Sequence, residues 1–140
     1  MLLILATHYR ALYLYSVQAH QLASKIVFHQ DHAFFNEVYD KAEGFYDNVI
    51  ERHIGLNGDE QIDLMLINQK ATEILAQLKT RGVSENKEFY IEILKQLQAT
   101  LPLVDKACKD PSTSVGTQNM LAQHADEIEV LVYKISRRIK

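Results

Sequence analysis

The chain has 140 residues, of which 47% are apolar and 24% are charged, and its formal net charge is −3. This size fits a single domain over residues 1–140 whose core needs no disulfide or metal to hold it. The negative charge argues against a strongly basic nucleic-acid binder. The single Cys108 excludes an internal disulfide framework and a multi-Cys zinc site. Five Gly and two Pro are too few for a loop-rich or disordered chain.

The first six residues, Met1–Ala6, form an apolar run that is followed closely by His8 and Arg10. A membrane-spanning helix needs roughly 20 apolar residues, and a signal peptide would begin with a charged region. We therefore expect neither a membrane anchor nor a signal peptide, and we expect a cytoplasmic protein with no membrane partner. The lone thiol is compatible with that reducing compartment.

Apolar residues recur at three- and four-residue spacing along most of the chain, which predicts helices throughout. The first helix is predicted over Leu2–His29. Asp31 is the expected N-cap of a second helix that reaches about His53. Gly55 and Gly58 are expected to break the chain after it.

A third helix is predicted over Glu60–Lys79, with Asp59 as its cap and Gly82 at its end. Ser84 opens a fourth helix, which has two Glu residues in its first turn, where negative charge interacts favourably with the helix dipole.

Pro102 is expected to kink or end the fourth helix, because its ring removes a helical hydrogen bond. Asp110–Pro111 is typical of an N-cap followed by Pro at the first helical position. The last helix is therefore predicted from there to about Arg138. The sequence thus predicts an all-α protein, with four long helices and one shorter or kinked piece packed as a bundle.

Motifs of several common enzyme classes are missing from the sequence. It has no Gly-rich phosphate loop, no Gly-x-Ser-x-Gly elbow and no His-Glu-x-x-His zinc motif. Cys108 has no identifiable catalytic partner, so a structural role explains it better than a nucleophilic one.

One polar stripe stands out on the second predicted helix. At about 100° per residue, His32, Asn36, Asp47 and Glu51 fall within about 100° around the helix axis, at the border of its apolar side. Carboxylates at such a border are costly unless they are paired or bound to metal. Acids four residues apart are also ordinary on a solvated helix face, so the spacing alone leaves both interpretations open.

These residues cannot bind one ion within one helix, because His32 and Asp47 are 15 residues, or roughly 22 Å, apart. Two copies of the helix packed antiparallel about a two-fold axis near Ala42 would bring His32 of one copy to the acidic end of the other. Ala42 and Gly44 are small and favour close approach. His20 on the first helix joins His32 if the two helices are antiparallel neighbours.

The residue types and spacing from His20 to Arg52 resemble those of the Dps-like mini-ferritins of the ferritin-like superfamily. The family pattern is His, His twelve residues on, Asp four later, Asp eleven later and Glu four later. The corresponding residues here are His20, His32, Asn36, Asp47 and Glu51. Tyr39 and Arg52 also lie where the family commonly has Tyr and Arg. Glu127–Tyr133 is similar to the family's last-helix segment, with Tyr133 in place of its usual Trp.

The resemblance implies a ferritin-like four-helix bundle, with the additional short or kinked helix between the second and third long helices. Such subunits form homodimers that build a dodecameric shell. The implied activity is that of a ferroxidase-type oxidoreductase, which oxidises ferrous iron with hydrogen peroxide or oxygen and stores the ferric product. This activity would protect against peroxide damage.

The resemblance also implies the residues of the site, which two subunits share. The metal ligands would be His20, His32, Asn36, Asp47 and Glu51, and the catalytic residues would be His20, His32, Asp47 and Glu51. Iron (Fe²⁺/Fe³⁺) is the expected metal, and zinc or another divalent ion can replace it.

The sequence departs from the family pattern at several positions. Asn36 replaces an Asp ligand, which removes a negative charge but leaves a carbonyl oxygen as a weaker ligand. Gln21 stands where the family has Trp. The Glu-x-x-His motif of larger ferritins is absent, which favours a site between subunits over one inside the bundle. The chain begins almost at the first helix, so we expect it to lack the basic N-terminal tail of some relatives.

Two other functions stay open at this point. If Asn36 marks a degraded metal site, the bundle would be a non-catalytic ferritin-like assembly protein. Alternatively, the basic end formed by Arg137, Arg138 and Lys140 would bind and protect DNA once it is repeated in a shell. A basic last turn is more often compensation of the helix dipole, and the negative net charge makes phosphate-driven binding weak.

Overall fold

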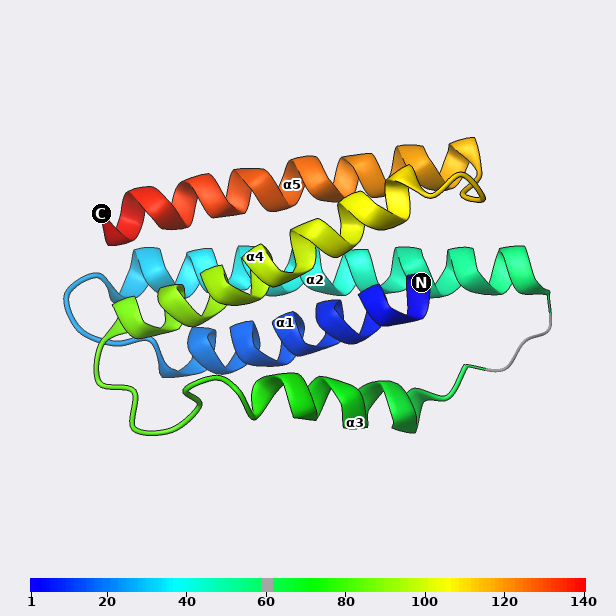
Figure 1. The fold of residues 1–140 in the computed structure, drawn as a ribbon. Coiled ribbons are helices and arrows are strands. Elements are labelled where there is room, and N and C mark those ends of the chain that lie inside the picture. Colours follow the sequence, from blue (N-terminus) through cyan, green and yellow to red (C-terminus); the bar gives the residue numbers. More distant parts are fainter. Residues whose placement is uncertain (59–61) are drawn as a thin grey trace.

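The computed structural model describes residues 1–58 and 62–140, and this part of the chain contains five helices and no strand. Four helices are long and one is short (Figure 1). They are α1 (Leu2–Leu22), α2 (Phe28–Asn57), α3 (Leu64–Leu75), α4 (Asn86–Lys109) and α5 (Val115–Ile139). The prediction of an all-helical protein is therefore confirmed.

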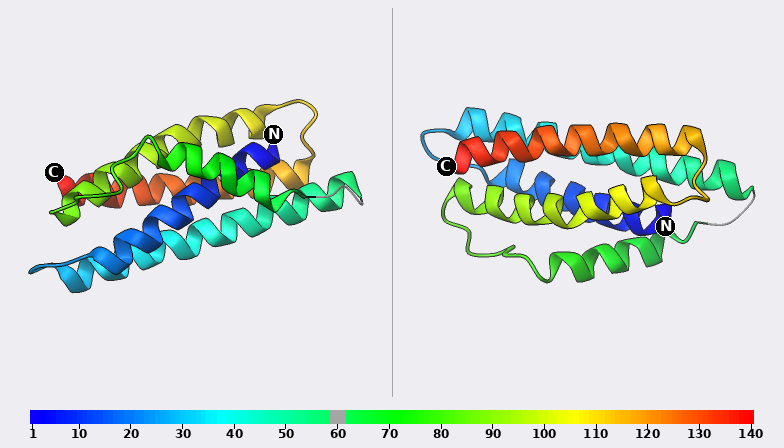
Figure 2. Two further views of the ribbon diagram at one scale, coloured as in Figure 1. Left: turned by 90° about the horizontal axis from the view of Figure 1, so that it is seen from below. Right: turned by 45° about the horizontal axis from the view of Figure 1, so that its top comes forward.

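The four long helices form two antiparallel pairs (Figures 1 and 2). The first pair is α1 with α2, and the second is α4 with α5; α1 also packs against α4, and α2 against α5. Because α2 and α4 run in the same direction, the chain must return along the bundle between them. The short helix α3 lies on this return and packs against α1.

The core runs along the middle of the bundle and follows the predicted apolar spacing. Its largest fully buried side chains come from α1, α2, α4 and α5; they are Tyr9, Tyr15, Phe35, Phe45, Leu5, Leu12, Ile93, Leu97, Leu121, Ile128, Leu131 and Ile135. On α5, the spacing Leu121, Ile128, Leu131 and Ile135 places all four on one stripe that faces the other helices.

The boundary between the first two helices differs from the prediction. Helix α1 ends at Leu22 instead of continuing to His29, because the chain turns between them and Lys25 adopts a left-handed φ of 70°. The N-cap of α2 is Val27, and Asp31 lies inside the first turn, where it is buried. Asp31 is therefore not the N-cap.

At its other end, α2 is longer than predicted and stops at Asn57. Gly55 is helical, while Gly58 follows the helix with a φ of 69°, a conformation that suits glycine. The predicted cap Asp59 and the predicted start Glu60 lie outside the described residues. Helix α3 begins at Leu64 because the Asp63 side chain accepts a hydrogen bond from the Leu66 amide.

Helix α3 ends at Leu75, earlier than predicted, so Gly82 lies in the following loop rather than at the helix end. Helix α4 is closed at its start by a capping box between Glu85 and Glu88, one residue beyond the predicted Ser84.

Pro102 does not end α4, which continues to Lys109. Its ring leaves the carbonyl of Gln98 without a helical partner. Both residues are exposed, so water can satisfy that carbonyl. The prediction for Asp110–Pro111 is wrong: Asp110 is the C-cap of α4 and its side chain accepts from the Ser112 amide. Helix α5 begins only at Val115.

In the described part of the chain, none of the helices combines the length and the apolar character that crossing a membrane requires.

Candidate functional site: an imidazole pair on helices α1 and α2

His20 and His32 lie side by side at one end of the α1–α2 pair. Their rings are stacked, with centroids 3.6 Å apart and an interplanar angle of 22°. The sequence favours this contact because His20 is in the last turn of α1 and His32 is in the second turn of α2, across a short connection. The structure thus joins the two histidines, as the antiparallel pairing of these helices predicts.

Each ring is fixed by a hydrogen bond to the other helix. The Nδ1 atom of His20 lies 2.8 Å from the carbonyl oxygen of His32, and the Nδ1 atom of His32 lies 2.7 Å from the carbonyl oxygen of His20. A carbonyl can only accept, so both Nδ1 atoms carry the proton and donate it. In the neutral rings, the lone pairs are then on the two Nε2 atoms.

Neither Nε2 atom has a hydrogen-bond partner within residues 1–58 and 62–140. This is the arrangement that a metal-binding histidine needs, because a hydrogen bond at one ring nitrogen orients the other toward the ligand. Aromatic side chains hold the pair in place: Phe28 stacks on His32 at 4.9 Å, and Tyr39 meets His20 edge-on at 5.3 Å.

The other three predicted ligands lie along α2. Asn36 is half-buried, one turn beyond His32, and its Nδ2 atom donates to Asp40, while its Oδ1 atom has no partner among the described residues. Asp47 and Glu51 are exposed and lie more than three helical turns from the imidazole pair. Within one chain, the structure therefore brings His20 and His32 together but not the acids.

No group of three or more His, Cys, Asp and Glu residues that could hold a metal ion occurs in the described residues of a single chain. The structure also corrects one detail of the predicted packing between subunits. Ala42 is fully buried in the core of its own chain, so it cannot ease the approach of a second copy. Gly44 is exposed, and the space where its Cβ would be is open.

Glu51 also borders a polar cleft of about 450 Å³ between α2 and α5. Arg52 crosses this cleft toward α5, where its Nη1 atom lies 3.4 Å from the hydroxyl of Thr117. Gly116 makes room for the guanidinium, because a Cβ there would be 3.1 Å from Nη1. Arg52 therefore links the acidic end of α2 to the first turn of α5.

Sequence reasoning missed a buried polar network in the middle of the bundle. His124 on α5 is 2% exposed; its Nδ1 atom lies 3.1 Å from the Tyr9 hydroxyl, and its Nε2 atom accepts from Asn48 at 3.1 Å. Phe45 packs on the ring at 4.5 Å. Burial lowers the pKa of His124 to about 4, so the ring is neutral near pH 7. In the sequence, His124 lies three residues after Leu121 and four before Ile128. This helical spacing places it on the apolar stripe of α5 and was the signal from which its burial could have been predicted.

A second missed network closes the end of the bundle near the imidazole pair. Asp31 accepts from Tyr90 at 2.5 Å and from Asn86 at 2.9 Å, and Arg138 donates two hydrogen bonds to it at 3.0 and 2.9 Å. Although burial opposes ionisation, the bonds from Arg138, Tyr90 and Asn86 hold the pKa of Asp31 below its usual range. The charge of Arg138 is therefore neutralised by its ion pair with Asp31. This reduces the positive charge at the basic end that was predicted to bind DNA.

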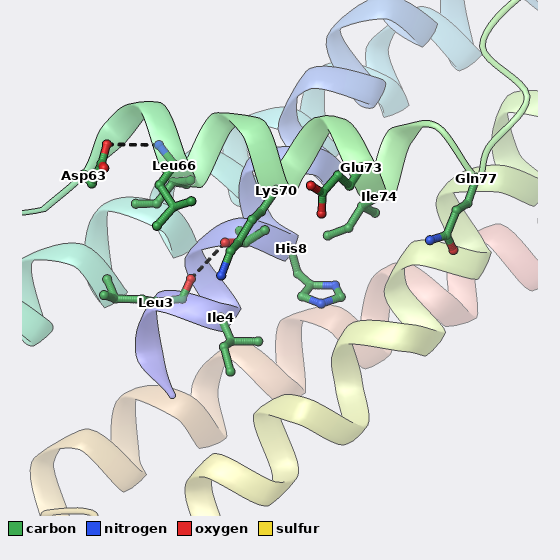
Figure 3. A pocket seen from close by; sticks show the side chains of 11 residues that line it. Leu3, Ile4, His8, Asp63, Leu66, Lys70, Glu73, Ile74 and Gln77 are labelled. Carbon is green, nitrogen blue, oxygen red and sulfur yellow. Dashed lines mark hydrogen bonds between the residues drawn. The ribbon is translucent and has the colours of Figure 1, made fainter.

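A separate cleft of about 600 Å³ lies between α1 and α3 (Figure 3). Aliphatic side chains such as Ile4 and Ile74 line it, and Lys70 and Glu73 extend over it from α3. His8 forms part of its wall, and burial lowers the pKa of that imidazole. His8 is 12 residues from His20, or about 18 Å along α1, so this cleft is distinct from the imidazole pair.

Cys108 is half-buried and its thiol donates to the Gln118 carbonyl at 3.4 Å, which fits a structural role. Comparison of the sequence with protein-family models and with curated proteins finds no match. The fold and the site thus define an all-helical bundle with an oriented imidazole pair at one end, and the function must be argued from that geometry.

Proposed function

We propose that the protein is a subunit of a Dps-like, ferritin-like assembly that binds ferrous iron between two copies and oxidises it. His20 and His32 of one copy, with Asp47 and Glu51 of a second, would hold the ion, and the free Oδ1 of Asn36 can assist. Two imidazoles with carboxylates suit iron with open coordination positions. The observation that carries the proposal is the reciprocally hydrogen-bonded His pair with both Nε2 atoms unpartnered.

Two further features support this proposal. A bundle with one long crossover between its second and third long helices has the connectivity of ferritin-like folds, and α3 lies on such a crossover here. Asp47 and Glu51 are exposed and make no ion pair within the described residues, so they are accessible to another copy. Both the bundle and the acids are therefore compatible with a site that two subunits complete.

In this reaction iron is the substrate. Two ferrous ions would each give up one electron to one molecule of hydrogen peroxide, which would be reduced to two hydroxide ions. The residues of the chain hold the ion and supply negative charge, which stabilises the ferric product more than the ferrous substrate. The ferric product would be stored inside a shell of copies, in the cytoplasm.

The test is ferrous oxidation by peroxide or oxygen, followed by the absorbance of the ferric product. We expect the Asp47→Ala/Glu51→Ala double variant to lose at least about tenfold in initial rate, since ligand carboxylates are removed. The matched control is Asp126→Ala/Glu129→Ala, which removes two exposed acids from α5. If the two variants oxidise iron as fast as the unchanged protein, the proposed function is wrong.

The non-catalytic alternative is favoured by one observation, the Asn at position 36. This alternative predicts that the protein assembles, but that ferrous iron in its presence is oxidised only as fast as free ferrous iron in solution. The same assay separates the two functions, because the non-catalytic protein would show no dependence on Asp47 and Glu51.

A further inference from the structure

The side chain of Asn86 holds the turn between α1 and α2. Asn86 is the first residue of α4, is 5% exposed, and lies at the same end of the bundle as this turn (Figure 1). Its Oδ1 atom accepts from the Ser24 amide at 3.0 Å, and its Nδ2 atom donates to the Ser24 carbonyl at 2.7 Å and to Asp31 at 2.9 Å. One buried side chain therefore bonds both backbone groups of Ser24 and also the first turn of α2.

The turn needs contacts of this kind because its backbone is not one that the chain adopts freely. Lys25 has a φ of 70°, a left-handed conformation that is uncommon and unfavourable for a residue with a side chain. Ala23 has a ψ of 140°, so the chain leaves the path of α1 directly after Leu22. Asn86 thus stabilises a path that the local preferences of the chain oppose.

The bond between Ser24 and Asn86 also affects the imidazole pair. In a continuing α-helix the Ser24 amide would donate to the carbonyl four residues earlier, which is that of His20. Here the amide donates to Asn86 instead. The His20 carbonyl is among the last four of α1, which lack a donor within a helix and point toward its C-terminal end, and it accepts from the Nδ1 atom of His32 at 2.7 Å. A further turn of α1 would bring Ser24 against the same oxygen and crowd the His32 ring.

We propose that Asn86 is a positioning residue of the imidazole pair, which acts through the Ser24 amide to fix the Nδ1–H form of His32. This inference rests on the proposed function, in which the Nε2 lone pair of His32 binds the ion. While Nδ1 donates to the His20 carbonyl, that lone pair stays on Nε2. Without Asn86, the Ser24 amide returns to the His20 carbonyl, and His32 loses the acceptor that selects this form. The His20 ring should be affected less, since its own acceptor is a carbonyl inside α2.

The test is NMR of the ring nitrogens in the metal-free full chain at about pH 8, where an ordinary imidazole is neutral. We expect the Nδ1–H form of His32 to predominate in the unchanged protein and to give way to a mixture of both tautomers in Asn86→Ala. Calorimetry with Zn²⁺, a divalent ion without redox chemistry, should show binding weakened at least about tenfold, as for other lost contacts behind a metal ligand. A predominant Nδ1–H form in Asn86→Ala, or an Nε2–H form in the unchanged protein, would overturn the proposal.

Two further variants separate positioning from stability. Asn86→Asp keeps an oxygen for the Ser24 amide but places a second carboxylate beside Asp31, so it should be less stable and still hold the Nδ1–H form of His32. Tyr90→Phe removes a different hydrogen bond to Asp31 and should also leave the tautomer unchanged. If either variant changes the tautomer as much as Asn86→Ala does, general stability controls it, and the proposal is wrong. If Asn86→Ala does not fold, Asn86→Ser replaces it, because the shorter side chain does not reach the Ser24 amide.

Failure of this inference can be distinguished from failure of the proposed function. If the His32 tautomer depends on Asn86 but iron oxidation does not depend on Asp47 and Glu51, the positioning role stands and the function is wrong. If iron oxidation depends on the two acids while the tautomer is the same with and without Asn86, the function stands and this inference is wrong.

Discussion

The buried imidazole of His124 predicts a specific loss of stability at acid pH. Its folded-state pKa is about 4, against an ordinary value of 6.5. Below pH 6.5 the unfolded chain therefore binds a proton that the folded chain does not, and the free energy of unfolding falls as the pH falls. The loss should be complete near pH 4, and above pH 6.5 the group contributes no pH dependence.

The expected size follows from the difference between the two pKa values. At about 1.4 kcal/mol per pKa unit, the shift of His124 corresponds to a loss of about 3 kcal/mol between pH 6.5 and pH 4. This is a large part of the stability of a typical domain. The ring faces Tyr9, Asn48 and Phe45, and no carboxylate in the described residues bonds to it, so nothing offsets the cost of charging it.

The assay is urea unfolding at several pH values between 7 and 4, for the unchanged protein and for His124→Gln. We expect the variant to be less stable at pH 7 but to lose less stability on acidification. Burial also lowers the pKa of His8, so His8→Gln serves as the comparison. Equal slopes for the unchanged protein and His124→Gln would refute the reasoning. If the variant does not fold, an NMR titration of the unchanged protein gives the pKa of His124 directly.

Other predictions follow from single contacts. Arg138→Ala should lower the free energy of unfolding by about 3 kcal/mol or more at pH 7, because it leaves the buried Asp31 without its cation; Arg137→Ala, which removes an exposed charge from the same turn, should change it by less than about 0.5 kcal/mol. Pro102→Ala should raise the melting temperature, because it restores a hydrogen bond inside α4. Asn36→Asp should tighten Zn²⁺ binding in calorimetry by supplying a charged ligand, whereas Ala33→Asp should do so far less.

The helical fold could be predicted from the sequence because its apolar spacing is regular. The helices and their packing as a bundle depend on that spacing, whereas the position of the short helix, between the second and third long helices, was implied by the family resemblance. The predicted ends of the helices were less accurate, because they depend on local backbone conformations that residue type does not determine. Asp31 illustrates this limit: Asp is a frequent N-cap, but here a tertiary contact with Arg138, 107 residues away, holds it inside the helix.

The candidate site, like the fold, could be predicted only in part from the sequence. The pairing of His20 with His32 could be predicted, because it needs only two antiparallel neighbouring helices joined by a short connection. The two carbonyl bonds that orient the rings could not, since they depend on side-chain rotation and on backbone atoms. His124 was missed because its spacing resembles that of any core residue, and its bonds to Tyr9 and Asn48 come from two other helices.

The different surroundings of these histidines indicate where the chemistry of the molecule lies. His124 has both ring nitrogens occupied and is surrounded by aromatic and amide groups, so it has no lone pair left for a ligand. His20 and His32 each have one nitrogen occupied by backbone and the other unpartnered in the described structure. Satisfying the hydrogen-bonding capacity of a histidine ring needs only a single partner. Here two rings are stacked, and each is also oriented by the backbone carbonyl of the other. Both rings are half-buried rather than fully buried, so their unpartnered Nε2 atoms make this pair, rather than the His124 network, the candidate site for the metal of the proposed function.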